Sequence, residues 1–255
     1  MLKHRYLLAE LIKIEITQNY KKSVLGITWL FLLPLLQSAI WLFLKWNGLI
    51  STGNIETNYV AFILLSTTLW QLYNYSYDFL GNSISTAIKP LTQGNTPLYI
   101  FLIARFVMIL FRFSISVFIN LIIIYTFITR DINIFSFAIY LLPYIIFCFT
   151  VGMLVSMLEV ISDDIYILGK EFNKLLYFIT PVFYANINPD TFVSKINKFN
   201  PLTYLISIPR DSFFNLTLEY KSIYLIISIA SITLFCLILF VYVKKARLLI
   251  EKIID

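Results

Sequence analysis

The sequence predicts an all-α polytopic membrane protein, and two observations carry this prediction. Of the 255 residues, 59% are hydrophobic and only 13% are charged, whereas a soluble domain usually carries about 25% charged residues. Six charge-poor stretches are each close to the roughly 20 residues that a helix needs to cross the hydrocarbon of a bilayer. No polar segment between them is long enough for a soluble module, so we expect residues 1–255 to form one membrane domain.

The first expected element is an amphipathic helix over residues 5–22 that lies in the membrane interface. On a helical wheel, polar residues such as Lys13 gather on one side and apolar residues such as Leu11 on the other. Glu15 interrupts the apolar side. It marks either a helix that packs on protein rather than lipid, or an ordinary amphipathic helix with one misplaced charge.

The six charge-poor stretches are expected to be transmembrane helices. The first ends at Lys45 and Trp46, a pair suited to the headgroup level. The fifth has only a short charge-free stretch with Pro181 inside it, so it extends back towards its N-terminus or is kinked. The expected spans cover residues 25–45, 57–78, 98–129, 132–158, 170–189 and 222–243.

The distribution of positive charge predicts that both termini are cytoplasmic, because lysine and arginine cluster before the first span and after the last. The net charge of +6 therefore gathers at the membrane face, which favours anionic membrane lipids over nucleic acid as partners. The segment after the fifth span departs from this pattern, because it carries Lys195, Lys198 and Arg210.

Five short motifs follow one another along the chain. The first fits the pattern R-Y-x-x-S-x-L-G-x-x-W-x-x-x-x-P, with Asn19 in place of the arginine, and its matching residues are Tyr20, Ser23, Leu25, Gly26, Trp29 and Pro34. The others are Val160–Ile165, Thr180–Tyr184, Phe199–Leu202 and Arg210–Asp211. In sequence and order they resemble the permease subunits of type-2 ABC exporters of bacterial polysaccharides, the O-antigen, capsule and teichoic acid group.

This resemblance implies a homodimer in the bacterial cytoplasmic membrane, working with two copies of a nucleotide-binding ATPase to export a lipid-linked polysaccharide. It implies short re-entrant helices on the outer side within residues 190–219. It also implies that the loop over residues 81–97 docks on the ATPase as a coupling helix. Asp164 matches an aspartate of the family, whereas Asp163 replaces an arginine. The residues expected to couple the permease to the ATPase are Glu15, Lys89, Asp163 and Asp164.

The chain itself lacks the motif that binds ATP phosphates. The Gly169–Lys170 pair is followed by Glu171 and has no preceding glycine at the spacing of a P-loop. We therefore expect a separate partner chain to bind ATP and Mg²⁺ and to hydrolyse the ATP. His4 is the sole histidine, so we expect no transition-metal site.

Aromatic residues make up 17% of the chain, more than interfacial anchoring alone would need. In the second span they form a stripe with one serine on a single helix face, which favours a channel wall that guides a glycan; packing between helices is the alternative. The stripe comprises Tyr59, Phe62, Ser66, Trp70, Tyr73 and Tyr77. Further candidate channel residues are Trp29, Phe43, Tyr177, Thr180 and Tyr184.

The cations of the outer segment have two competing interpretations. They neutralise phosphate or acidic sugars on the emerging glycan, or they anchor the re-entrant helices to lipid headgroups. Arg210 is the stronger phosphate candidate, because its planar guanidinium suits bidentate binding.

Two other functions compete with polysaccharide export. One is a type-2 ABC permease for drugs or small lipids, which would not need so long an aromatic stripe. The other is a membrane-embedded acyl- or glycosyltransferase, which would need an essential histidine or carboxylate at the membrane face. The carboxylates expected there are Asp78, Glu159, Asp163 and Asp164, and they stand in no recognised arrangement.

Overall fold

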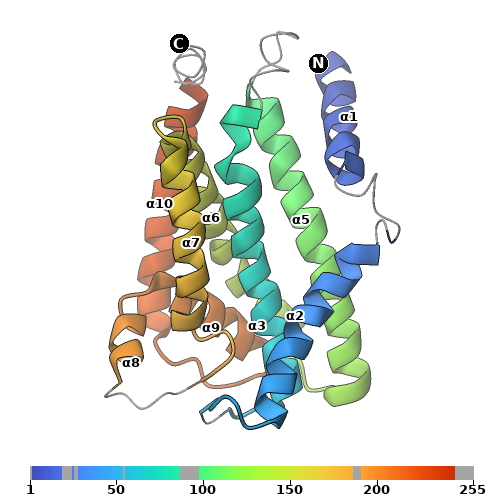
Figure 1. Cartoon of the computed structure of the whole chain (residues 1–255), viewed down its shortest axis with the longest axis vertical. Coiled ribbons are helices and arrows are strands. Elements are labelled where there is room, and N and C mark those ends of the chain that lie inside the picture. The colour runs from blue at the N-terminus through green and yellow to red at the C-terminus, as the bar shows by residue number, and fades with distance from the viewer. Residues whose placement is uncertain are drawn as a thin grey trace.

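The computed structural model describes residues 2–18, 25, 28–53, 55–86, 98–185 and 191–244, and it contains helices and turns but no strand within these ranges. The α-helix that begins at Leu2 and the one that ends at Lys244 reach the same end of an elongated bundle (Figure 1). The elements are α1 (Leu2–Gln18), α2 (Trp29–Trp46), α3 (Tyr59–Tyr75), the π-helix η2 (Ser76–Leu80), α5 (Leu98–Ile123), the π-helix η3 (Ile124–Ile128), α6 (Ile134–Glu159), α7 (Asp163–Ile179), α8 (Phe192–Asn197), α9 (Pro201–Phe213) and α10 (Lys221–Lys244).

Helix α3 is the centre of the bundle. It packs against α2, α5, α6 and α9, and every side chain from Ala61 to Tyr73 is buried. Asn58 caps its N-terminus by accepting a hydrogen bond from the backbone N–H of Val60 at 2.9 Å. A helix surrounded by protein in this way has almost no surface left for lipid.

The polar side chains of α3 bond to the neighbouring helices. Thr67 pairs with Ser38 of α2 at 2.8 Å, and Tyr144 of α6 donates to the carbonyl of Leu69 at 2.7 Å. Asn120 of α5 donates to the hydroxyl of Thr68. Inside a membrane such bonds join helices that have no hydrophobic drive to associate.

The prediction of spanning helices is confirmed at three positions. The helical segments Leu98–Ile128, Ile134–Glu159 and Lys221–Tyr242 are long and apolar enough to cross a membrane, and they match the third, fourth and sixth expected spans. The first expected span corresponds to α2, whose apolar stretch Phe31–Trp46 is shorter.

The fifth expected span is wrong at both ends. Helix α7 begins at Asp163, where Ser162 caps it by accepting from the backbone N–H of Asp164 at 3.3 Å. It ends at Ile179, because Thr180 adopts an extended conformation before Pro181. The motif Thr180–Tyr184 therefore lies in a turn after the helix and not within the helix.

The expected connection over residues 81–97 is helical at residues 83–86, and residues 87–97, including Lys89, lie outside the described ranges. Its docking on an ATPase stays a prediction. Helix α1 packs on α5 and runs along it in Figure 1. Its placement in the membrane interface stays a prediction.

The segment after the fifth span forms two short helices, as the resemblance implied, at the end of the bundle away from the termini (Figure 1). Thr191 caps α8 through a 3.3 Å bond from the Ser194 N–H. Asn200 caps α9 through a 3.0 Å bond from the Leu202 N–H, with Pro201 at the first helical position. Helix α9 is largely buried against α3, α6 and α10.

Helices α6 and η2 approach each other closely at Gly152. A Cβ at this position would lie 2.4 Å from the Ser76 carbonyl oxygen and 2.7 Å from the Leu80 Cβ. Glycine is therefore the residue that permits this contact between the two backbones.

Candidate functional site

The predicted stripe on α3 and η2 is buried in this structure. None of its six side chains is more than 8% exposed, and each contacts α7, the turn that follows α7, or α9. The stripe is thus covered by other segments of the same chain, and its role as a channel wall stays a prediction.

The two tyrosines of the stripe nearest the termini bind α7. Tyr73 donates to the side-chain oxygen of Asn173 at 3.1 Å, and Tyr77 donates to the carbonyl of Tyr166 at 3.1 Å. A Cβ on Gly169 would lie only 2.1 Å from the Tyr77 hydroxyl oxygen. The Tyr77 ring therefore lies directly on the backbone of α7.

Further along the stripe, rings from α2, α3, α7 and the turn after α7 form an aromatic cluster of Trp41, Trp70, Tyr177 and Phe183. Tyr177 lies 5.0 Å from Trp70 and 5.6 Å from Trp41 between ring centroids, and Trp41 stacks on Phe183 at 4.1 Å. The sequence predicted Trp70 and Tyr177 but missed Trp41 and Phe183. Both belong to charge-poor stretches rich in aromatic residues, the signal that identified the others.

The other two residues predicted on α2 do not join this cluster. Phe43 is 60% exposed, and Trp29 is half-buried at the beginning of the helix. The face of α2 that was predicted to line a channel thus points away from the α3 stripe in a single chain.

The turn after α7 is bonded to the short helices. The Thr180 hydroxyl accepts a hydrogen bond from the amide of Asn200 at 2.9 Å. The Tyr184 hydroxyl accepts from the amide of Asn197 at 3.0 Å and donates to the Ile179 carbonyl. Both predicted residues therefore hold α8 and α9 against the end of α7.

Arg210 is buried, which does not fit the phosphate contact predicted for it. Its Nη1 donates to the Pro181 carbonyl at 3.0 Å and to the Ser66 hydroxyl at 3.3 Å, and its Nε donates to the Asp211 carboxylate at 2.9 Å. Its guanidinium carbon lies 4.1 Å from the centre of the Phe62 ring, close enough for a cation–π interaction. The guanidinium group that was expected to bind phosphate is thus bonded to other groups of the protein.

The remaining predicted residues lie at the surface or outside the described side chains. Lys195 on α8 and Lys198 just after it are exposed. Asp163 and Asp164 are exposed in the first turn of α7, where carboxylates interact favourably with the helix dipole. The side chain of Glu15 lies outside the described side chains. The coupling role of Glu15, Asp163 and Asp164 stays a prediction.

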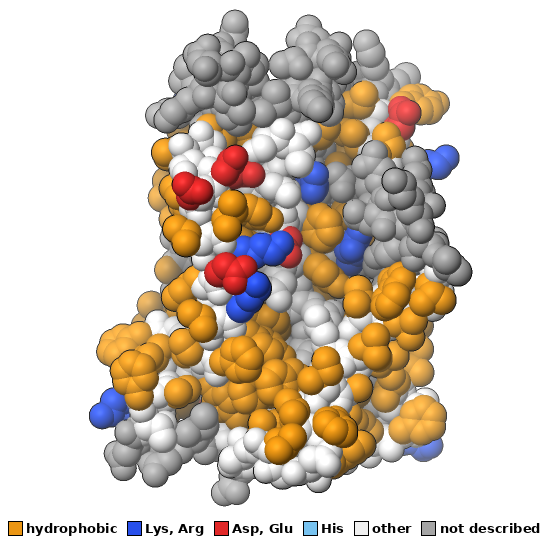
Figure 2. Space-filling model, viewed as in Figure 1, with side chains coloured by type: hydrophobic (Ala, Val, Ile, Leu, Met, Phe, Trp, Pro, Cys, Tyr) orange, Lys and Arg blue, Asp and Glu red, His pale blue; other side chains and the backbone are white. Residues whose placement is uncertain are grey.

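The sequence analysis missed a charged row on the outer face of α7 and η2, formed by Asp78, Lys170, Glu171 and Lys174. Lys170 pairs with Asp78 at 3.2 Å, and Lys174 pairs with Glu171 at 2.7 Å. Figure 2 shows basic and acidic atoms together about halfway along the bundle, with hydrophobic side chains above and below them. Lys170, Glu171 and Lys174 lie on consecutive turns of one helix, and this spacing could have indicated a charged helix face. It was overlooked because the fifth span was expected to start at residue 170.

A buried polar network lies nearer the termini and was also missed. The Ser83 hydroxyl lies 3.0 Å from the hydroxyls of Ser156 and Tyr242, so that it joins the end of the α3 segment to α6 and α10. Ser85 donates to the carboxylate of Glu159 at 2.6 Å. The Glu159 carboxylate therefore takes part in a structural hydrogen bond. Within the described ranges, no three His, Cys, Asp or Glu side chains lie together as metal ligands.

No family model matches the chain. The chain is 26% identical over 223 residues to the O-antigen export system permease protein RfbA of Klebsiella pneumoniae, and the alignment covers 82% of this chain and 80% of that protein. This similarity extends over most of both chains and confirms the resemblance to the permease subunits of type-2 ABC exporters of bacterial polysaccharides.

Proposed function

We propose that this chain is the membrane permease of an ATP-driven exporter that moves a lipid-linked polysaccharide out of the cytoplasm. Its similarity to an O-antigen export permease and its bundle of apolar helices support this assignment. A separate ATPase supplies the energy, and two copies of the permease enclose the path.

The single observation that carries the proposal is the charged row. Lys170 and Glu171 lie at the middle of α7, where they and Lys174 and Asp78 form two ion pairs. On the face drawn in Figure 2, basic and acidic atoms gather about halfway along the bundle with hydrophobic side chains above and below them. Charged side chains at that depth are costly against hydrocarbon, and they face a bundle interior or a water-filled cavity in membrane proteins. The face formed by α7 and η2 therefore faces an aqueous passage rather than lipid.

The aromatic stripe lies behind this face and supplies contacts suited to sugars. Aromatic rings pack on the C–H faces of sugars, and tyrosine hydroxyls bond to sugar hydroxyls. The stripe meets a glycan only after α7 separates from α3, which breaks the bonds of Tyr73 to Asn173 and of Tyr77 to Tyr166. In this mechanism, the ATPase drives that separation through the cytoplasmic ends of the helices.

A deletion of the gene in its native host tests the function. We expect polysaccharide to disappear from the cell surface and lipid-linked polysaccharide of normal structure to accumulate in the cytoplasmic membrane, with both effects reversed by a plasmid copy. Unchanged surface polysaccharide would favour export of drugs or small lipids. A polysaccharide of altered structure, measured by mass spectrometry, would favour a transferase.

Cysteine labelling tests whether the charged row faces water. Glu171 lies eight residues from the end of α7 on the side of the termini, and the exposed native Cys236 lies eight residues from the corresponding end of α10. We expect Glu171→Cys, in a Cys236→Ser background, to react with a membrane-impermeant maleimide several-fold faster than Cys236 in the unmodified chain. The reason is that a thiol must ionise in water to react. Equal rates at the two positions would show that the α7 face is no wetter than α10.

A further inference from the structure

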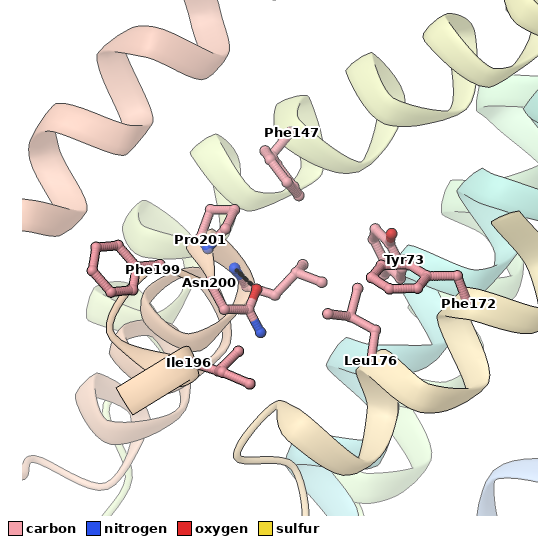
Figure 3. Close-up of a pocket in the computed structure, with 9 residues that line it drawn as sticks. Tyr73, Phe147, Phe172, Leu176, Ile196, Phe199, Asn200 and Pro201 are labelled. Atoms are coloured by element: carbon pink, nitrogen blue, oxygen red, sulfur yellow. Dashed lines mark hydrogen bonds between the residues drawn. The ribbon is translucent and has the colours of Figure 1, made fainter. Parts of the chain in front are cut away.

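A pocket of about 340 Å³ opens between α3, α6, α7 and the two short helices. Figure 3 shows Tyr73, Phe172 and Leu176 on one side of it, and Ile196, Phe199, Asn200 and Pro201 on the other, with Phe147 closing one end. Its volume falls near the lower end of the roughly 300–1,000 Å³ typical of ligand pockets. This pocket therefore has room for one hydrocarbon chain but not for a whole lipid.

The polar atoms at this pocket are already bonded to protein. The Tyr73 hydroxyl donates to Asn173, the Asn200 amide donates to Thr180, and the Asn200 side-chain oxygen accepts from the Leu202 N–H. The rest of the lining is aromatic and aliphatic. A sugar or a charged group would find few free partners here, whereas a hydrocarbon chain would leave no polar group unsatisfied.

Two cations at α8 are next in sequence to residues of the apolar lining. Lys195 directly precedes Ile196, and Lys198 directly precedes Phe199; both lysines are exposed. Figure 2 shows basic atoms beside hydrophobic side chains at the position of α8. An apolar pocket with two adjoining positive charges complements a molecule that has a hydrocarbon tail and a negatively charged head.

We propose that the pocket binds one acyl chain of an anionic phospholipid, taken from the membrane leaflet on the side away from the termini. The phosphate group of that lipid lies against Lys195 and Lys198, and its tail extends between α7 and α9. The bound chain fills the space between the short helices and the bundle. None of the residues that line this pocket belongs to the charged row, so the proposal rests on observations other than the one that carries the proposed function.

Native mass spectrometry of the purified full chain tests the proposal. The protein is incubated in detergent with equal amounts of phosphatidylglycerol and phosphatidylethanolamine, and the lipid that remains after washing is counted. We expect one phosphatidylglycerol per chain, retained several-fold better than phosphatidylethanolamine. Absence of retained lipid, or equal retention of the two lipids, would overturn the assignment.

Two variants separate the tail from the headgroup. Ile196→Trp fills the pocket from α8 and should abolish lipid retention, whereas Val193→Trp on the same helix, outside the lining, should not. Lys195→Gln with Lys198→Gln should keep a lipid but remove the preference for phosphatidylglycerol. Arg130→Gln with Lys221→Gln, which removes two exposed cations elsewhere, should keep that preference. Lipid binding by Ile196→Trp at the level of the unmodified chain would contradict the proposal even if the preference were present.

Discussion

Replacing Gly152 with alanine is expected to destabilise the fold strongly. The new Cβ would lie 2.4 Å from the Ser76 carbonyl oxygen, which belongs to the backbone of η2 and cannot rotate away. Overpacking of this kind costs about 1–3 kcal/mol and occasionally more, which outweighs the roughly 1 kcal/mol that alanine gains over glycine in a helix. We expect a clear fall in the temperature at which purified protein loses its monodisperse peak in size-exclusion chromatography.

Gly81 provides the matched control for this experiment. A Cβ there would first meet the Val155 Cγ1 at 2.9 Å and the Tyr166 ring at 3.1 Å, and both belong to side chains that can shift. Gly81→Ala should therefore change thermal stability much less than Gly152→Ala. If the two variants lose stability equally, the close contact between α6 and η2 is not the cause.

Replacing Arg210 with lysine is expected to reduce the amount of folded protein. Lysine keeps the charge but cannot bond to Ser66, Pro181 and Asp211 together in the geometry of the guanidinium group. At least one of these acceptors would lose its hydrogen bond, and a buried polar group left unsatisfied costs about 1–3 kcal/mol. The quantity to measure is the fraction of membrane protein that remains soluble and monodisperse in mild detergent.

Variants of the exposed lysines at α8 distinguish a packing role of Arg210 from phosphate binding by Arg210. Lys195→Gln with Lys198→Gln removes two cations at the same end of the bundle without touching a buried contact, so the yield of folded protein should not change. If Arg210→Lys folds normally but exports no polysaccharide, the phosphate interpretation would stand and the packing role would be wrong.

The sequence predicted the apolar helices better than the site. Long charge-poor stretches identify α5, α6 and α10, because lipid exposure requires apolar residues all along these helices. Helix α7 was misplaced, because it carries Lys170, Glu171 and Lys174 and so looks like a loop on a hydropathy scale. A helix with one charged face and a polar loop have similar shares of charged residues, so a hydropathy scale does not separate them.

Individual roles were harder to predict, because they depend on which distant segment each residue meets. The stripe was recognised as one helix face, yet its neighbours on α7 and α9 are set by tertiary packing. Arg210 was expected to be a phosphate-binding cation of the outer segment, and its contact with Ser66, 144 residues away, has no local signature. Trp41 was overlooked for the same reason, because its partner Phe183 follows a different span.

The burial of α3 has a consequence for how the protein is made. Ribosomes deliver this helix early, but its partners arrive much later: Tyr144 follows Leu69 by 75 residues, and Arg210 follows Ser66 by 144. Until then Thr68 lacks its bond from Asn120 of α5 and Ser66 lacks its bond from Arg210 of α9, so these hydroxyls remain without those partners in a lipid surrounding or in the insertion machinery. Insertion of α3 and its final packing are therefore separate events in time, and nascent chains that stop before α9 should be substrates for membrane quality control.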